Sequence, residues 1–430
     1  MANTFKYGSG VWATKKGSSL AYNDQDDNYK PLPFTTDRAS TATRVNKEGL
    51  IEVVGQDKLR IDYTDSTKGV ALLEPSRTNL FPYSNDFVSD WTKANITTES
   101  SSLISVDGTD NARLIYPTSS SSGYTYVYDA ITASSSTYTV SAFVKASGIN
   151  VVWLYVQSIG QHGLIYFDLS DETKQVVAGS SSTPTGTIED MGNDWYRITF
   201  TTGVSLALSS GIGIGISDAK GPSSVTKNGK DGVLIYGLQL EAGSYPTSYI
   251  PTSGSSVTRV ADTANGAGNS EVFNDSEGVL YANIAALADD STYRGISISD
   301  ASYSDRCVIR YGGASNRINV LVSSGSTDVF DKNSTSSTAT EFNKIVLKWK
   351  ANDFALWING FELETATSGA APSGLKQLQF ADSINSSVFL YGKTKEVKVY
   401  DAVLSDTDLE YLTSYRSLEE MATELNLNTL

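Results

Sequence analysis

Apolar and polar residues alternate along many short segments of this chain, and serine- and glycine-rich turns separate these segments. Alternation with a period of two places successive side chains on opposite faces of a β-strand. Short strands at regular spacing are typical of β-sandwiches. The pattern therefore predicts an all-β protein.

The strands fall into two blocks, so we expect two β-sandwich domains. The first is predicted at residues 81–252 and the second at residues 253–404. Residues 1–80 are interrupted by glycine, proline and aspartate, which predicts an irregular N-terminal arm with short strands. Residues 405–430 are predicted to form a short C-terminal helix and tail.

The helix prediction covers residues 405 to about 425. Ser405 can cap the helix, with Asp408 three residues later in a variant of the capping box. An apolar seam at four-three spacing follows, formed by Tyr411, Tyr415, Leu418, Ala422 and Leu425. Two interpretations stay open: the seam docks on the second sandwich, or it is an oligomerisation surface between copies of the chain.

One segment combines a strand with an exit loop. Residues Val233–Leu240 alternate as a strand, and Pro246 and Pro251 then remove backbone donors, so the ladder ends. The residues predicted to fold back against the sheet edge are Tyr245, Tyr249 and Ile250. Such a segment closes one sandwich and leads into the next.

Several phrases along the chain resemble one protein family. They are Leu238-Gln-Leu-Glu241 with Pro246–Thr252 and Val257-Thr-Arg259, Asn193–Arg197, Thr36–Ile51, Arg60–Tyr63 and Leu72–Leu80. They resemble a carbohydrate-binding-module-like jelly roll found in bacteriophage tail and head fibre proteins.

The second sandwich carries a resemblance of its own. Trp357-Ile-Asn-Gly360 contains the Asn-Gly dipeptide that favours a tight hairpin. This hairpin, and the exit Ala402–Leu412 into a helix, resemble the concanavalin A-like, laminin-G-type lectin domain.

These resemblances imply a non-enzymatic virion structural protein: a fibre, spike or decoration subunit, assembled in the host cytoplasm and located in the virion. The arm at residues 1–80 would bind other virion proteins, and the lectin-like domains would bind host-surface polysaccharide. Single glycan sites of this kind are weak, so several copies on one particle are expected. A homo-oligomer, most simply a trimer, would supply them.

Composition narrows the range of partners. The net charge of -15 disfavours nucleic acid as a partner, because binding to phosphates depends on Lys and Arg. The first residues lack the apolar region of a signal peptide. No apolar run approaches the ~20 residues that span a bilayer. We therefore expect no nucleic acid partner and no membrane insertion.

Catalysis has little support in the sequence. The single histidine, His162, and the single cysteine, Cys307, leave few nucleophile–base pairs and too few ligands for a zinc site. We predict no catalytic residues, no metal and no cofactor. Glycoside hydrolysis needs only two carboxylates, and Glu362 and Glu364 share a predicted strand face. A polysaccharide-degrading enzyme therefore stays open as an alternative, as does a purely structural virion subunit.

Aromatic residues are the candidates for glycan binding. In Val151–Gln157, alternation assigns Val152, Leu154 and Val156 to a core face and the other residues to an outward face. The candidates on that outward face are Trp153, Tyr155 and Gln157, and a second one-sided ladder holds Tyr124, Tyr126 and Tyr128. Flat rings stack on sugars and an amide bonds their hydroxyls. The same faces could instead pack against the arm or a neighbouring subunit. Trp195 and Trp349 are predicted core residues.

Overall fold

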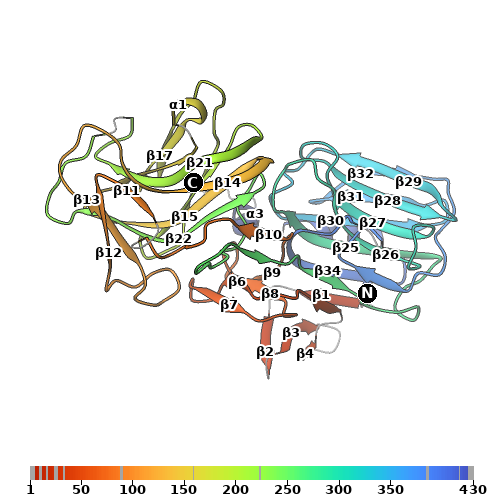
Figure 1. The fold of residues 1–430 in the computed structure, drawn as a ribbon. Helices are drawn as coiled ribbons and strands as arrows, with labels where there is room; N and C mark the ends of the chain where they lie inside the picture. The colour runs from red at the N-terminus through yellow and green to blue at the C-terminus, as the bar shows by residue number, and fades with distance from the viewer. Residues whose placement is uncertain are drawn as a thin grey trace. The chain divides into compact units, whose positions relative to one another are not determined.

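The computed structural model of the protein describes residues 5–8, 12–15, 18–23, 28–31, 34–87, 91–157, 159–221, 224–383, 387–415 and 417–424. Strands dominate throughout this part of the chain, and the few helices are short (Figure 1). The predicted all-β class is confirmed. No helix within the described residues has the length and apolar character needed to cross a membrane.

The chain divides into two compact units. Unit 1 comprises residues 1–40, 55–75 and 261–430, and unit 2 comprises residues 41–54 and 76–260. The sequence predicts that residues 1–80 form a separate arm. In the structure, the described residues of this segment belong partly to unit 1 and partly to unit 2. The physical reason is apolar burial, since all four residues of Val70–Leu73 are buried. Attachment of this segment to other proteins stays a prediction.

Unit 2 is a sandwich of two antiparallel sheets of six strands each. The β14 sheet has the order β11 (Thr92–Ala94), β14 (Thr125–Ser136), β21 (Leu206–Ser217), β16 (Val151–Val156), β17 (Leu164–Asp168) and β18 (Thr173–Val177). The β22 sheet has the order β12 (Ile96–Ser100), β13 (Arg113–Pro117), β22 (Gly232–Ala242), β15 (Tyr138–Ser147), β20 (Tyr196–Thr201) and β19 (Ile188–Asp190). Side chains from both sheets form one core cluster. It contains the predicted core residues Val152, Leu154 and Val156.

Smaller elements complete unit 2. They are the pair β6 (Ala42–Val45) and β7 (Ile51–Val54), the pair β10 (Arg77–Asn79) and β23 (Val257–Arg259), and the one-turn helix α1 (Ile159–His162).

Unit 1 is a second sandwich. Its larger sheet has the order β32 (Phe361–Ala366), β31 (Phe354–Ile358), β30 (Asn343–Lys350), β25 (Glu277–Ala286), β34 (Gly392–Tyr400), β9 (Val70–Leu73) and β8 (Arg60–Asp62), and β1 (Phe5–Gly8) also pairs with β34. Its smaller sheet has the order β29 (Thr327–Ser334), β28 (Ile318–Ser324), β27 (Arg306–Tyr311), β26 (Arg294–Ser299) and β33 (Gln377–Gln379). One core cluster draws residues from both sheets, and it includes the predicted core residue Trp349.

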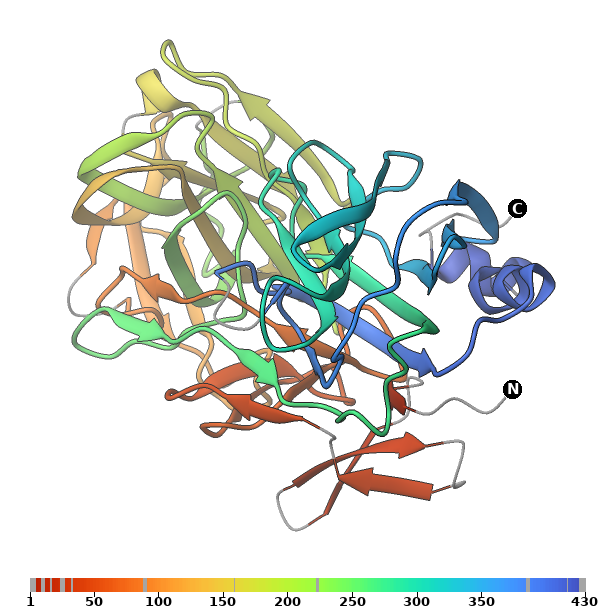
Figure 2. The same ribbon diagram turned by 90° about the vertical axis from the view of Figure 1, so that its right-hand side faces the viewer.

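Short strands and two helices flank this sandwich. The strands are the sheet β2 (Trp12–Lys15), β3 (Ser18–Asn23) and β4 (Asn28–Pro31), and the pair β5 (Thr35–Asp37) and β24 (Thr263–Asn265). The helices are α2 (Asp406–Thr413) and α3 (Leu418–Glu424), blue in Figure 2. Leu409 of α2 joins a cluster on the larger sheet that also contains Trp357.

The sequence predicts one C-terminal helix over residues 405 to about 425, but the structure has two helices there, α2 and α3. Ser405 caps α2 as expected, and its Oγ accepts a hydrogen bond from the Asp408 backbone N–H at 3.2 Å. The helix then ends, because Ser414 has extended backbone angles. The Ser417 Oγ accepts from the Glu420 N–H at 2.9 Å, which is the arrangement of a new N-terminal cap. The apolar seam is therefore not one continuous helical stripe.

A buried ion network joins the separate segments of unit 1. The Arg38 Nη1 donates to Asp262 Oδ1 at 2.7 Å, and the Arg60 Nη1 donates to Glu74 Oε2 at 2.6 Å. Arg60 also pairs with the second Asp262 oxygen. Burial alone would lower the pKa of Arg60, but the carboxylates of Glu74 and Asp262 raise it. Three of these residues lie in the family phrases of the N-terminal segment, so those phrases hold the fold of unit 1 together.

A buried network of hydrogen bonds holds the exit loop of unit 2. The Gln239 Nε2 donates to Glu241 Oε2 at 2.7 Å, and the Thr247 backbone N–H donates to the same oxygen at 2.9 Å. The Ile250 N–H donates to Gln239 Oε1 at 2.6 Å. Tyr249 and Ile250 are buried, as predicted. The phrase from Leu238 onward therefore pins the loop after the last strand to that strand.

Replacing Asp262 tests the ion network. We expect Asp262→Asn to lower the free energy of unfolding by about 3–5 kcal/mol, because two arginine side chains would stay buried without their shared carboxylate. Chemical denaturation measures the change. Glu364→Gln is the matched control, since Glu364 pairs with Lys332 at a half-exposed position and such pairs contribute little. Equal effects of the two substitutions would contradict the assignment.

Candidate functional site

The centre of the candidate site is strand β21, whose two faces differ completely. Ile212, Ile214 and Ile216 belong to the core cluster of unit 2. The residues between them, Gly213 and Gly215, have no side chains to cover the opposite face of the sheet. This face therefore has a floor of backbone along β21, with β14 on one side and β16 on the other.

Aromatic residues from the two neighbouring strands lie beside this floor. Gly215 pairs with Tyr126 on β14 and with Trp153 on β16. Gly213 pairs in the same way with Tyr128 and Tyr155. Two parallel rows, each with an aromatic ring on either side of a glycine, cross the sheet.

The glycines make room for these rings. A Cβ atom built on Gly211 would lie 2.6 Å from Tyr128 Cδ2 and 2.9 Å from Tyr155 Oη. A Cβ atom built on Gly215 would overlap the indole ring of Trp153. Any larger residue on β21 would push the rings away from the sheet.

The rings form one connected group, here called the aromatic platform. Its members are Tyr124, Tyr126, Tyr128, Trp153, Tyr155 and Tyr166. The ring centroids of Tyr126 and Trp153 are 5.5 Å apart, as are those of Tyr126 and Tyr155. The Tyr124 ring lies edge-on to Trp153 at 5.3 Å. The structure thus brings together the two sets of residues that the sequence predicted separately.

Exposure within the platform differs from the prediction. Trp153 is completely buried and Tyr155 is 5% exposed, so the expectation that both face solvent is wrong. Neighbouring rings enclose the indole, and its Nε1 donates to the Ile216 carbonyl at 3.2 Å. Tyr124 is 37% exposed, and Tyr126 and Tyr128 are half-buried. The tyrosine ladder is therefore the accessible part of the platform.

Gln157 is placed differently from the rings. Its φ of 65° ends the regular strand, and its side-chain oxygen accepts a hydrogen bond from the Ser209 backbone N–H at 3.1 Å. The amide therefore ties the end of β16 to β21. Its contact with a glycan stays a prediction.

The hydroxyl groups of the platform are the second notable feature. Within the described part of the chain, those of Tyr124, Tyr126, Tyr128 and Tyr155 make no hydrogen bond to protein. Burial raises the pKa of Tyr155, and the neighbouring Tyr126 and Tyr128 raise it further. Burial also raises the pKa of Tyr126. The phenols of Tyr126 and Tyr155 therefore stay protonated at neutral pH and present neutral O–H donors beside apolar ring faces.

The predicted oligomerisation residues occupy varied positions. Tyr411 and Leu418 are 63% and 68% exposed, whereas Ala422 is buried. The Tyr415 ring lies 5.0 Å from the Lys344 Nζ. Leu425 lies outside the described residues. Self-association through these residues stays a prediction.

Each group considered for catalysis has its own local surroundings. The His162 Nδ1 is 3.3 Å from the Ser182 Oγ, and no carboxylate hydrogen-bonds the ring among the described residues. Cys307 lies in the core of unit 1, where burial raises the pKa of its thiol. Glu364 pairs with Lys332 at 3.7 Å. Across the described ranges, no three His, Cys, Asp or Glu side chains are grouped to hold a metal ion.

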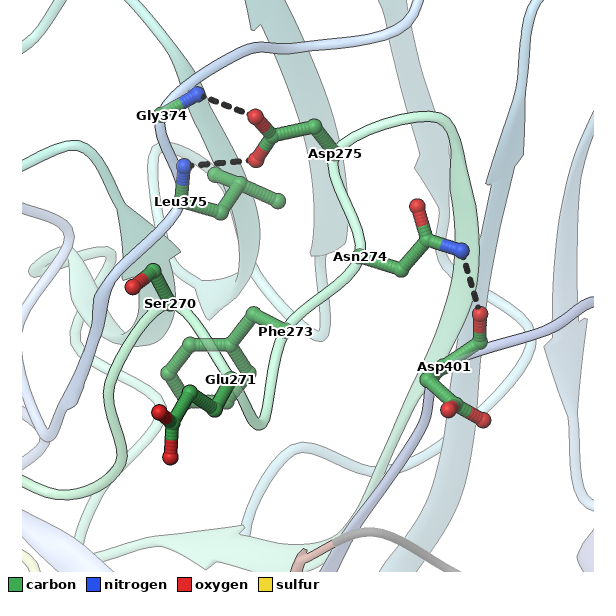
Figure 3. Close-up of a pocket in the computed structure, with 8 residues that line it drawn as sticks. All are labelled: Ser270, Glu271, Phe273, Asn274, Asp275, Gly374, Leu375 and Asp401. Atoms are coloured by element: carbon green, nitrogen blue, oxygen red, sulfur yellow. Dashed lines mark hydrogen bonds between the residues drawn. The ribbon is translucent and has the colours of Figure 1, made fainter.

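A pocket of about 430 Å³ in unit 1 was not foreseen from the sequence (Figure 3). Asp275 accepts hydrogen bonds from the Gly374 and Leu375 backbone N–H groups at 2.7 and 2.8 Å. The Asn274 Nδ2 donates to the Asp401 carbonyl at 2.7 Å. These contacts tie the loops around the pocket to one another, so its polar groups already have a structural role.

One comparison with known proteins concerns a part of unit 1. Residues 281–410 match the family described as the concanavalin A-like lectin/glucanases superfamily. This match supports the predicted lectin-type sandwich in that part of the chain. No curated protein matches the sequence.

Among solved structures, the chain is similar to the CBM40 of the Ruminococcus gnavus IT-sialidase. The identity is 15% over 35% of this chain and 94% of that chain, with a TM-score of 0.29 for that structure and 0.30 for its complex with α2,3 sialyllactose. Domains LG4-5 of the mouse laminin α1 chain are 9% identical over 65% of this chain and 86% of that chain, with a TM-score of 0.23.

Enlarging a glycine of β21 tests how the platform is built. We expect Gly215→Ala to lower the free energy of unfolding by about 1–3 kcal/mol, because the added methyl group overlaps the Trp153 ring. Denaturant unfolding measures this loss. Gly160→Ala is the control, since no atom lies within 4 Å of its added Cβ. If both variants were as stable as the parent protein, the close packing of ring on glycine would be refuted.

Proposed function

We propose that this protein binds carbohydrate through the aromatic platform of unit 2. The observation that carries the proposal is the combination of accessible tyrosine rings with phenol groups that have no hydrogen-bond partner among the described residues. Sugars present apolar C–H faces and many hydroxyl groups, so a flat ring and a neutral O–H suit them together. The lectin-type sandwich of unit 1 is consistent with a protein built for glycan display.

The buried members of the platform have a supporting role in this proposal. Trp153 and Tyr155 set the height and tilt of the tyrosine rings beside them, because their ring centroids lie 5.5 Å from that of Tyr126. Direct contact with a glycan would come from Tyr124, Tyr126 and Tyr128. A binding face on strands is also more rigid than one on loops.

We also propose that the protein acts without catalysis, as a displayed subunit of a bacteriophage virion that recognises host-surface glycans. The resemblance of the phrases around Thr36–Ile51 and Leu238–Thr252 to fibre proteins supports this role. Weak binding at each platform would be strengthened by several copies on one particle. Incubation with host polysaccharide should release no reducing sugar, and measurable turnover would reject the non-enzymatic part of the proposal.

Substitution of one platform tyrosine tests the glycan site. We expect Tyr128→Phe to weaken binding of a neutral oligosaccharide about fivefold, because the ring remains and only one hydrogen bond is lost. Tyr128→Ala should weaken binding further, since stacking is lost as well. Isothermal titration with a ligand found by glycan-array screening measures both.

Tyr116→Phe is the matched control. Tyr116 lies on β13 in the other sheet of unit 2, where its hydroxyl donates to Glu99 at 3.2 Å. This variant should bind the oligosaccharide as the parent protein does. Equal affinity of the Tyr128 variants and the parent protein would show that the platform is not the binding site.

The location of the protein can be tested directly. Purified phage particles from lysed host cells should contain this chain in stoichiometric amounts, measured by mass spectrometry and located by antibody labelling in electron microscopy. Its absence from washed particles would reject the virion role and leave the glycan proposal standing.

A further inference from the structure

The smaller sheet of unit 1 carries arginine residues on the face opposite the core. Cys307, Ile309 and Tyr311 of β27 point into the core cluster. Alternation along the strand therefore places Arg306 and Arg310 on the other face. Register places Arg306 opposite Ser323 and Arg310 opposite Asn319, both on β28.

The two guanidinium groups share one carboxylate. The Arg310 Nη1 lies 3.4 Å from Asp382 Oδ2, and the Arg306 Nη1 lies 3.8 Å from the same oxygen. Both distances are long for a charge-assisted hydrogen bond. Within the described residues, the Nη2 atoms of these two arginines donate no hydrogen bond. By contrast, Arg294 on the next strand makes two short contacts with Asp290, at 2.7 and 2.8 Å.

Other nearby polar groups are already engaged. The Asn319 Oδ1 accepts from the Arg310 Nε at 2.8 Å, and its Nδ2 donates to Asp331 at 2.6 Å. The Ser323 Oγ donates to Asp328 at 2.7 Å. Burial lowers the pKa of Arg306, and Arg310 lowers it further against the opposing effect of Asp382. The Arg306 Nη1 also donates to the Asp382 carbonyl at 3.2 Å. The arginine pair is thus partly desolvated, and within the described residues its two Nη2 groups are the donors that a ligand could use.

Exposed tyrosine rings flank the pair. The Tyr293 ring centroid lies 4.7 Å from the Arg310 Cζ, and the Tyr303 ring centroid lies 4.8 Å from the Arg306 Cζ. The two tyrosines are 38% and 51% exposed. The rings hold the guanidinium groups by cation–π contact and keep part of their own surface open. We call Tyr293, Arg310, Arg306 and Tyr303 the arginine band.

Two further residues on this face bear on the band, and the second of them points to a ligand. Gly295, opposite Arg310 on β26, gives the Arg310 side chain room to lie close to the sheet, since a Cβ atom there would be 2.9 Å from the Arg310 Cβ. Gln379 lies one strand beyond, on the face opposite the core residue Leu378. It is 2% exposed, and its Nε2 has no hydrogen-bond partner in the described structure. A buried donor of this kind is uncommon in proteins.

We propose that the arginine band is a second carbohydrate site, selective for an acidic glycan that carries carboxylate or sulfate groups. The two guanidinium groups supply paired donors for such an anion, and the tyrosine rings supply faces for the adjoining sugars. The site lies in the other unit from the aromatic platform and does not depend on it. The net charge of -15 repels polyanions at long range, so recognition rests on these local contacts.

Titration of the full-length protein with three matched sugars tests this site. The probes are a galacturonic acid tetramer, a sulfated galactose tetramer and a neutral galactose tetramer. We expect one or both charged tetramers to bind, more weakly as salt rises, and the neutral tetramer to leave this site empty. The charged tetramer that binds more tightly identifies the anion. Failure of both charged tetramers to bind would overturn the proposal.

Variants locate the binding. The double variant Arg306→Gln/Arg310→Gln should bind the charged tetramer about tenfold more weakly or worse. The variant Arg306→Lys/Arg310→Lys keeps the charge and loses the paired donors, so an intermediate loss is expected even if the first variant folds poorly. Arg113→Gln in unit 2 is the control and should bind normally. An unchanged Kd in both double variants overturns the assignment.

The two glycan proposals remain distinguishable in this experiment. Tyr128→Phe should leave binding of the charged tetramer unchanged, because the platform and the band lie in different units. Loss of charged-tetramer binding in Tyr128→Phe, with the arginine variants unaffected, would place the anion on the platform and refute the arginine band.

Discussion

The alternation of isoleucine and glycine along β21 is the constraint on which the rest of unit 2 depends. One face of this strand supplies three core side chains, and the other face supplies none. The strands on both sides must therefore cover the bare backbone, and only large flat side chains reach far enough. Tyr126 and Trp153 do so in one row, and Tyr128 and Tyr155 in the next. The same ring contacts that cover the glycine face of β21 therefore also form the aromatic platform.

Buried polar networks give a structural reason for the phrases singled out in the sequence. In unit 1, Arg38, Arg60 and Glu74 meet at Asp262, which lies far along the sequence. In unit 2, Gln239 and Glu241 hold the exit loop. A buried charge without a partner is costly, so each network requires several residues at once. The residues of these phrases therefore stabilise the fold. The candidate ligand contacts, in the aromatic platform and the arginine band, are made by other residues.

The sequence predicts the class of the fold well, because periodicity in single strands is a local property. It placed Val152, Leu154 and Val156 in the core correctly. It failed on the exposure of Trp153, because that depends on which strand lies next to it. The glycines of β21 were the available signal, since an aromatic face beside a glycine face predicts closure of the rings. Ser417 was a similar signal for the start of a second helix. The arginine band could not be predicted from the sequence for the same reason, since its residues come together only through the order of the strands.

The most direct test of the central claim is a crystal structure of the protein with a bound neutral oligosaccharide from a binding screen. The predicted result is a sugar ring stacked on Tyr126 or Tyr128, with its hydroxyls bonded to the tyrosine phenols. A sugar well ordered at another place in unit 2, with the tyrosine ladder still in contact with solvent, would contradict it.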